Sequence, residues 1–159
     1  DLVRSRGLGD VYKRQASTRC SRAEGMRAAL VQLNVTDLPD ENLPGILAFI
    51  DQAVAGGAEF VLTPEVTNCI STDRAHQHAV LRHEEDDRTL AALRARARDH
   101  GVWLLIGSLA LLTHDPDGRF ANRSFLITPE GEIAARYDKI HMFDVQVSET
   151  EVYLSLIHI

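Results

Sequence analysis

Hydrophobic residues along the chain follow two spacings, one typical of buried strands and one typical of amphipathic helices. Residues 27–35 (RAALVQLNV) are almost continuously apolar and predict a central strand that is covered on both faces. Residues 41–58 then place apolar side chains at helical spacing, with Pro44 suited to the first turn and Gly56–Gly57 to the end. Residues 58–65 are a second buried-type strand. Strand, helix and strand over this length predict a parallel crossover.

A second helix and strand follow the same plan. The helix is expected to begin near Asp86 or Asp87, whose carboxylate can cap the free backbone amides, and to stop at Gly101. Residues 102–109 (VWLLIGSL) come directly afterwards and form another apolar run. This segment therefore predicts a further strand of the same sheet.

The last clear pattern is a pair of strands around a short turn. Residues 119–127 and 132–139 have strand character, and residues 128–131 (TPEG) between them have the proline and glycine of a type I turn. The two strands therefore predict an antiparallel hairpin. Strands that alternate with helices and then form a hairpin define an α/β layered domain with a mixed sheet.

The two ends of the chain do not match the middle. Residues 1–25 show neither spacing and hold six basic against three acidic side chains, and Met26 directly precedes the first strand pattern. The segments GDVYKRQ in this head and LSLIHI at residues 154–159 resemble translated adapter or cloning read-through. We therefore expect a non-native or disordered head, a truncated domain at residues 26–153 and a non-native tail. A native arm and a short native strand are the alternative.

Composition narrows the class of protein. Hydrophobic residues make up 45% of the 159 and charged residues 25%, as in globular domains. The net charge of −6 argues against a nucleic-acid partner. No apolar run approaches the roughly 20 residues of a membrane span, so we expect no membrane partner and a cytoplasmic location. Cys20 and Cys69 lack the spacing of a zinc site or disulfide framework.

Two residues at predicted strand ends are candidates for chemistry. Glu65 follows a strand and a proline, where open α/β sheets place ligand crevices, and partial burial there would raise its pKa and make it a general base. A helix-capping or surface acid is the alternative. Lys139 also ends a strand, where a fixed ammonium can stabilise an oxyanion. Its alternative is an ion pair with Asp138 or Asp144 on the hairpin rim.

Three segments together resemble the nitrilase superfamily of carbon–nitrogen hydrolases: the first strand with VQLN, the stretch LTPEVTN, and RYDKIHMFD. The resemblance covers residues 26 to 153 and is greatest to the branch with omega-amidases and deaminated-glutathione amidases. It implies the N-terminal part of a four-layer α-β-β-α sandwich with a mixed sheet. It also implies hydrolysis of a small linear amide without cofactor or metal, by an intact parent protein that forms a homodimer.

The resemblance also implies roles for individual residues. Glu65 would be the general base, Lys139 would stabilise the oxyanion, and a cysteine further along the chain would attack the amide carbon to form a thioester. No cysteine follows Lys139, so the fragment itself is expected to be inactive. Cys69 is expected to be a small buried residue. Glu149 and Glu151 lie near the place where many members carry a further glutamate.

Other polar residues have plainer interpretations. The histidines of residues 76–83 form an HxH-x4-H pattern, but the charged residues around them indicate a solvated helix or loop rather than a metal site. His141 is expected to order the Lys139 segment by hydrogen bonding. Asn122 and Arg123 are either structural or line the pocket.

Two other classes of protein are alternatives to the hydrolase interpretation. The first is a non-catalytic α/β binding or interaction module that keeps the scaffold. The second is a nucleotide-binding α/β domain, which is disfavoured because no GxGxxG or GxxxxGK[ST] follows the first strand. A sandwich cut partway through also exposes an apolar sheet face, so poor solubility or association is expected.

Overall fold

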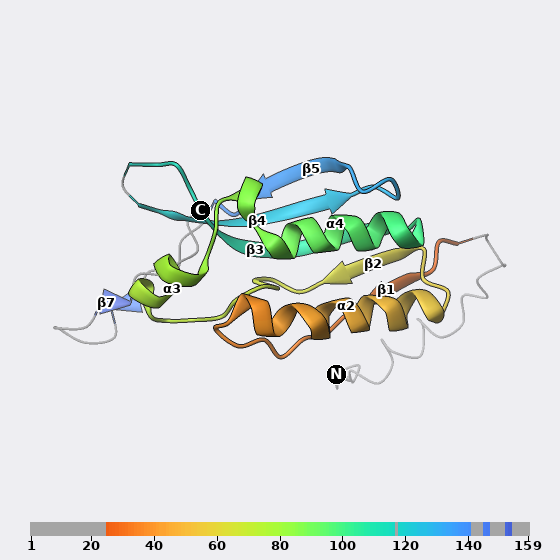
Figure 1. Cartoon of the computed structure of the whole chain (residues 1–159), viewed down its shortest axis with the longest axis horizontal. Helices are drawn as coiled ribbons and strands as arrows, with labels where there is room; N and C mark the ends of the chain where they lie inside the picture. The colour runs from red at the N-terminus through yellow and green to blue at the C-terminus, as the bar shows by residue number, and fades with distance from the viewer. Residues whose placement is uncertain (1–24, 117, 141–144, 147–151, 154–159) are drawn as a thin grey trace, which may run out of the picture.

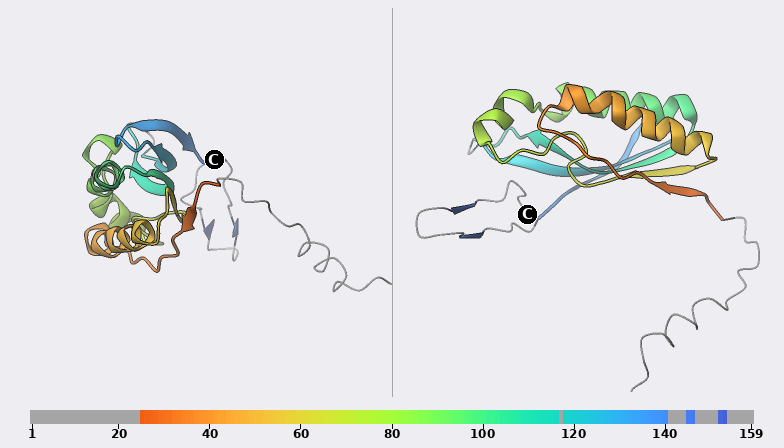
Figure 2. Two further views of the ribbon diagram at one scale, coloured as in Figure 1. Left: turned by 90° about the vertical axis from the view of Figure 1, so that its right-hand side faces the viewer. Right: turned by 90° about the horizontal axis from the view of Figure 1, so that it is seen from below.

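The computed structural model describes residues 25–116, 118–140, 145–146 and 152–153. A five-stranded sheet is covered on one face by two long helices (Figures 1 and 2). Strands β6 (Val145–Gln146) and β7 (Val152–Tyr153) form a separate antiparallel ladder. The head at residues 1–24 and the tail lie outside the described residues, as do several side chains considered above: Cys20, His141, Asp144, Glu149 and Glu151.

The first three strands are parallel. β1 (Ala28–Leu30), β2 (Phe60–Thr63) and β3 (Trp103–Leu112) lie side by side, with α2 (Pro39–Ala55) and α4 (Arg88–His100) in the two connections. In Figure 1 both helices run along the sheet next to each other. The predicted parallel crossover is therefore confirmed, and the second helix and strand extend it.

The last two strands are antiparallel. β4 (Phe120–Ile127) pairs with β3, and β5 (Ile133–Asp138) pairs with β4, so the hairpin and the mixed sheet are confirmed. The turn between them closes with the Gly131 N–H donating to the Thr128 carbonyl at 2.9 Å. A short helix, α3 (Arg74–Val80), and the 3-10 turn η1 (Glu84–Asp86) occupy the segment between β2 and α4.

The helix ends agree with the sequence at three of the four positions. Asp87 caps α4, because its Oδ1 accepts the Leu90 N–H at 2.7 Å, and Gly101 ends it with φ +64°. Gly56 and Gly57 follow the last residue of α2. The start of α2 was predicted wrongly. Pro39, whose missing N–H costs no hydrogen bond in the first turn, begins the helix, and Pro44 lies inside it.

β1 differs from its prediction in length and in position. The pattern predicted a central strand over residues 27–35, but β1 has three residues and lies at the edge of the five-stranded sheet. The Leu30 side chain is 79% exposed. The apolar pattern reflects side chains directed to both faces, and the described residues cover only the face under the helices.

Both faces of the sheet are apolar, and among the described residues only the face under the helices is packed. Between the helices and the sheet lies a core that includes Ile46, Ile50, Leu93, Leu104 and Phe125. Residues paired directly across strands share a face. On the opposite face this pairing aligns a row of small and large apolar side chains, namely Leu30, Leu62, Leu105, Leu126 and Ala135.

Candidate active site

The sheet topology brings the two predicted site residues to one edge. β2 and β5 point in the same direction, because β2 and β3 are parallel and two antiparallel steps lead from β3 to β5. Glu65 comes two residues after the end of β2, and Lys139 directly follows β5. The Lys139 Nζ donates to Glu65 Oε1 at 2.7 Å. Residues 74 positions apart in sequence thus form an ion pair where two strands end.

Asn122 is the third member of this site. Its side chain is 4% exposed, and its Nδ2 donates to Glu65 Oε1 at 2.9 Å. Lys139 and Asn122 therefore both bind the same carboxylate oxygen. No hydrogen bond to Glu65 Oε2 occurs within the part of the chain that the structure describes. Both donors therefore hold the carboxylate through the same oxygen, Oε1.

The pKa of Glu65 is lowered from its ordinary value of 4.5. The hydrogen bond from Lys139 lowers it most, partial burial opposes this, and the Asn122 amide lowers it further. The expected rise from burial is therefore wrong, because the side chain is still 51% exposed and a cation binds it directly. Glu65 is a carboxylate at neutral pH.

A charge network fixes the strand end that carries Lys139. Arg123 donates from Nε and Nη2 to the two Asp138 carboxylate oxygens, at 2.6 and 2.8 Å, and from Nη1 to Glu84 at 2.7 Å. These bonds raise the pKa of Arg123, and the bonds to Asp138 have the largest effect. Arg136 adds a second bond to Glu84 at 2.8 Å. Asp138 is thus engaged by Arg123, and the alternative of an Asp138–Lys139 pair is wrong.

A profile described as carbon-nitrogen hydrolase matches residues 27–156 of the chain. The chain belongs to the carbon–nitrogen hydrolase family. A deaminated glutathione amidase from Yersinia enterocolitica is 33% identical over 121 residues, which are 76% of this chain and 42% of that protein. An omega-amidase from Homo sapiens is 28% identical over 121 residues, with the same two coverages. This carbon–nitrogen hydrolase chain thus spans less than half the length of these curated relatives.

Solved structures agree with this assignment. An amidase from Nesterenkonia sp. is 30% identical with a TM-score of 0.61, over 74% of this chain and 44% of that one. The NitFhit protein of C. elegans, at 24% identity, shares the fold with a TM-score of 0.68 over 82% of this chain and 32% of that one. The nitrilase-like α/β fold is therefore confirmed. The described residues supply one helical layer and one sheet of its four-layer sandwich.

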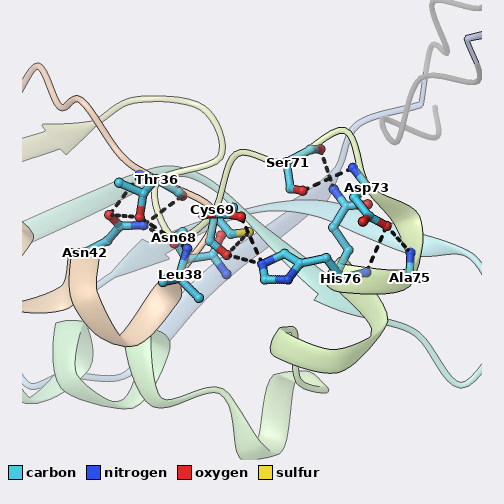
Figure 3. Close-up of polar contacts among 11 residues, drawn as sticks. Thr36, Leu38, Asn42, Asn68, Cys69, Ser71, Asp73, Ala75 and His76 are labelled. Atoms are coloured by element: carbon cyan, nitrogen blue, oxygen red, sulfur yellow. Dashed lines mark hydrogen bonds and ion pairs between the residues drawn. The ribbon is translucent and has the colours of Figure 1, made fainter.

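Cys69 is a buried thiol with a raised pKa. The residue is 1% exposed, as its small apolar character predicted, and its thiol contacts the Asp37 carbonyl oxygen at 3.4 Å (Figure 3). Burial, with a smaller contribution from the charge of Asp37, raises the pKa of Cys69 to about 11. A thiol with this pKa is almost entirely protonated at neutral pH and is a poor nucleophile.

The loop after Glu65 is tied to two neighbouring segments. The Asn68 side chain exchanges two hydrogen bonds of 2.9 Å with the backbone of Ala110 in β3. The Asn42 amide donates to the carbonyl oxygens of Thr36 and Asn68, both at 3.0 Å (Figure 3). The strand end that carries Glu65 is therefore followed by a rigidly held segment.

The three histidines of residues 76–83 bind different neighbours. His76 Nε2 lies 3.0 Å from the Asp37 carbonyl oxygen (Figure 3), His78 packs on Phe120, and His83 stacks on His114. Over the described ranges, no group of three or more His, Cys, Asp or Glu side chains is arranged to hold a metal ion. Within the same ranges, no helix has the length and apolarity to cross a membrane.

Proposed function

We propose that the protein containing this chain hydrolyses the C–N bond of a small linear amide, giving a carboxylic acid and ammonia. Glu65 acts as general base and Lys139 stabilises the oxyanion. The observation that carries this proposal is the 2.7 Å contact between Lys139 Nζ and Glu65 Oε1 at two strand ends. Amidases among the relatives and solved structures support the same reaction class.

The ionisation of Glu65 suits it to accept a proton. The carboxylate is charged at neutral pH because Lys139 and Asn122 stabilise that form. Both donors bind Oε1, so Oε2 takes the proton of the attacking group in this proposal and returns it to the leaving ammonia. Water then attacks the thioester carbon: its proton passes to Oε2 and from there to the cysteine sulfur as the C–S bond breaks and the acid leaves.

Lys139 supplies positive charge where negative charge develops. Its backbone is fixed by the N–H bond to Asn122 and by the Arg123–Asp138 pair one residue earlier. A positioned cation stabilises a developing oxyanion without reorganising during the reaction. The described geometry therefore supports a preorganised ammonium in this role.

The nucleophile in this proposal is a cysteine that lies outside these 159 residues. A solved form of the Nesterenkonia amidase carries an acetamide moiety covalently added at its active-site cysteine. By analogy, a cysteine thiolate attacks the amide carbon and forms a thioester that water hydrolyses. Cys69 is unsuited because it is buried and protonated. Residues 26–153 alone are then inactive.

We also infer a small-molecule amide as the partner and a cytoplasmic homodimer as the working form. The similarity to the amidase branch supports these inferences. Light scattering coupled to size exclusion measures the oligomeric state of the full-length protein. A stable monomer with full activity contradicts the homodimer.

The reaction is tested by ammonia release from succinamate with the full-length protein and three variants. We expect Glu65→Gln and Lys139→Met each to lower kcat by about 10²-fold or more. Glu130→Gln is the matched control, because it removes an exposed carboxylate from the β4–β5 turn. Full activity of Glu65→Gln contradicts the proposed base. Amide binding without turnover by the wild type favours the non-catalytic module instead.

A further inference from the structure

The residue after Glu65 has an unusual backbone conformation. Val66 has φ +51°, and it is the one non-glycine residue with positive φ among those that the structure describes. A β-branched side chain is poorly suited to this left-handed region, which glycine adopts without steric cost. The backbone is therefore strained at Val66, the residue that follows the candidate base.

Ser108 accepts two hydrogen bonds from the backbone of this turn. The Val66 N–H donates to Ser108 Oγ at 2.7 Å, and the Thr67 N–H donates to the Ser108 carbonyl oxygen at 2.9 Å. Ser108 is 2% exposed, so its hydroxyl is fixed inside the protein. Leaving this partly buried N–H without its acceptor would cost stability, and the bond therefore holds the turn in place.

A distortion in β3 makes room for the same contact. The pairing register between β3 and β4 shifts between Ile106 and Leu109, which places an irregularity at Gly107 and Ser108. A Cβ atom on Gly107 would lie 2.4 Å from the Thr63 carbonyl oxygen and 2.5 Å from that of Pro64. The end of β2 thus lies directly on the irregular part of β3. Bulges of this kind redirect side chains next to active sites.

We propose that Val66 and Ser108 are positioning residues, which together form a strained elbow that aims the Glu65 side chain at Lys139 and Asn122. This inference rests on the proposed function of Glu65. Strain of this type persists only where the surroundings over-determine it, and here Ser108, Gly107 and the Asn68 bonds to β3 do so. A turn with no positioning role could hold glycine at this position.

The first measurement tests the strain by thermal unfolding. At an ordinary position glycine is less stable than alanine. At residue 66 we expect Val66→Gly to melt about 2–4 °C above Val66→Ala, because both lack the valine side chain and only glycine relieves the left-handed strain. An equal or lower melting temperature for the glycine variant overturns the strained elbow.

The second measurement separates positioning from stability in the full-length protein. We expect Val66→Gly to lower kcat roughly tenfold or more with a smaller change in KM, because the turn becomes mobile while the chain becomes more stable than Val66→Ala. Val66→Asn, which tolerates the left-handed region and keeps a Cβ, should retain most of the activity. If kcat follows melting temperature across the three variants, the positioning role is wrong.

The third measurement needs no turnover. A ¹³C NMR titration of Glu65 should show its pKa higher in Val66→Gly and Ser108→Ala than in the wild type, because the Lys139 and Asn122 bonds are made less often. Ser71→Ala is the control, since its hydroxyl also accepts a backbone N–H, that of Asp73, elsewhere in the loop. An unchanged Glu65 pKa in both test variants overturns the elbow. Failure of the proposed general-base role is detected separately, because the Glu65→Gln variant would then be active.

Discussion

The backbone N–H of Lys139 donates to the carbonyl oxygen of Asn122 at 3.0 Å. The same asparagine binds Glu65 through its side chain, so a single residue of β4 connects both members of the ion pair. Asn122→Asp keeps the shape and the backbone bond but places an acceptor against Glu65 Oε1. We expect the pKa of Glu65 to rise, because a donor is lost and a like charge is added. A ¹³C NMR titration measures it.

The sign of the pH dependence follows from the lowered pKa. In the wild type, the charged Glu65 adds to the free energy of unfolding at pH values above 4.5, the ordinary pKa of the group. This contribution is lost as the pH falls through the lowered pKa of the folded state. In Asn122→Asp this contribution shrinks. Asn122→Ala, which removes the donor alone, should raise the pKa of Glu65 less. A Glu65 pKa that is the same in all three proteins contradicts the assigned role of the Asn122 amide.

Two substitutions at Asp87, the cap of α4, separate the effect of the cap hydrogen bond from the effect of the carboxylate charge. Asp87 is buried, and desolvation raises its pKa although Oδ1 accepts the Leu90 N–H. Asp87→Ala loses the cap and should cost about 1 kcal/mol in the free energy of unfolding. Asp87→Asn keeps an acceptor and carries no charge, so it should match or exceed the wild type at neutral pH. Denaturant unfolding measures both.

The pH dependence of unfolding stability in the wild type and in Asp87→Asn gives an independent check. A carboxyl with a raised pKa in the folded state contributes stability below its unfolded pKa, and this contribution is lost as the pH rises through the folded value. The stability of Asp87→Asn relative to the wild type should therefore increase between about pH 3 and pH 7. A difference that stays constant over this interval means that desolvation of Asp87 has no measurable effect.

Cys69 should resist thiol reagents until the fold opens. In a Cys20→Ser background it is the single thiol of the chain. Its burial and its pKa of about 11 predict that alkylation at about pH 8 is limited by opening of the structure rather than by the reagent. Mass spectrometry follows the modified fraction at increasing urea. Rapid labelling in native buffer, at the rate found in urea, contradicts the buried thiol.

Two glycines with similar backbone angles offer a matched test of packing. Gly131 and Gly101 have φ +80° and +64°, so alanine at either position suffers backbone strain. A Cβ on Gly131 would also lie 2.8 Å from the Arg94 carbonyl oxygen, whereas nothing lies within 4 Å of one on Gly101. Gly131→Ala should therefore melt at a lower temperature than Gly101→Ala. Equal melting temperatures contradict close packing of the β4–β5 turn on α4.

Much of the architecture could be predicted from the sequence because it depends on local chemistry. The Asp87 cap, the glycine at the end of α4 and the TPEG turn each require particular residue types. Glu65 and Lys139 were both predicted to lie at strand ends. Their meeting at one edge also depends on the direction of β5 relative to β2, which the antiparallel pairings β3–β4 and β4–β5 fix together. These features follow from residue types and strand order alone.

Other features depend on contacts that no local pattern encodes. The lowered pKa of Glu65 requires the Lys139 bond and a half-exposed side chain, neither of which is visible in LTPEVTN. The Asn122 bond depends on strand register. The left-handed conformation of Val66 contradicts its residue type, and the backbone there binds a serine 42 positions away. Pro39 was overlooked as a helix start because Pro44 had a similar signature.

The order of strands across the sheet, identical to their order along the chain, has a consequence for folding. The β3–β4–β5 meander closes short loops and can form early, whereas β1 and β2 join it only after two helical crossovers are closed at greater entropic cost. Glu65 lies in the late-forming half and Lys139 at the end of the meander. Their contact therefore forms only when both halves have joined, and it reports completed assembly of the sheet.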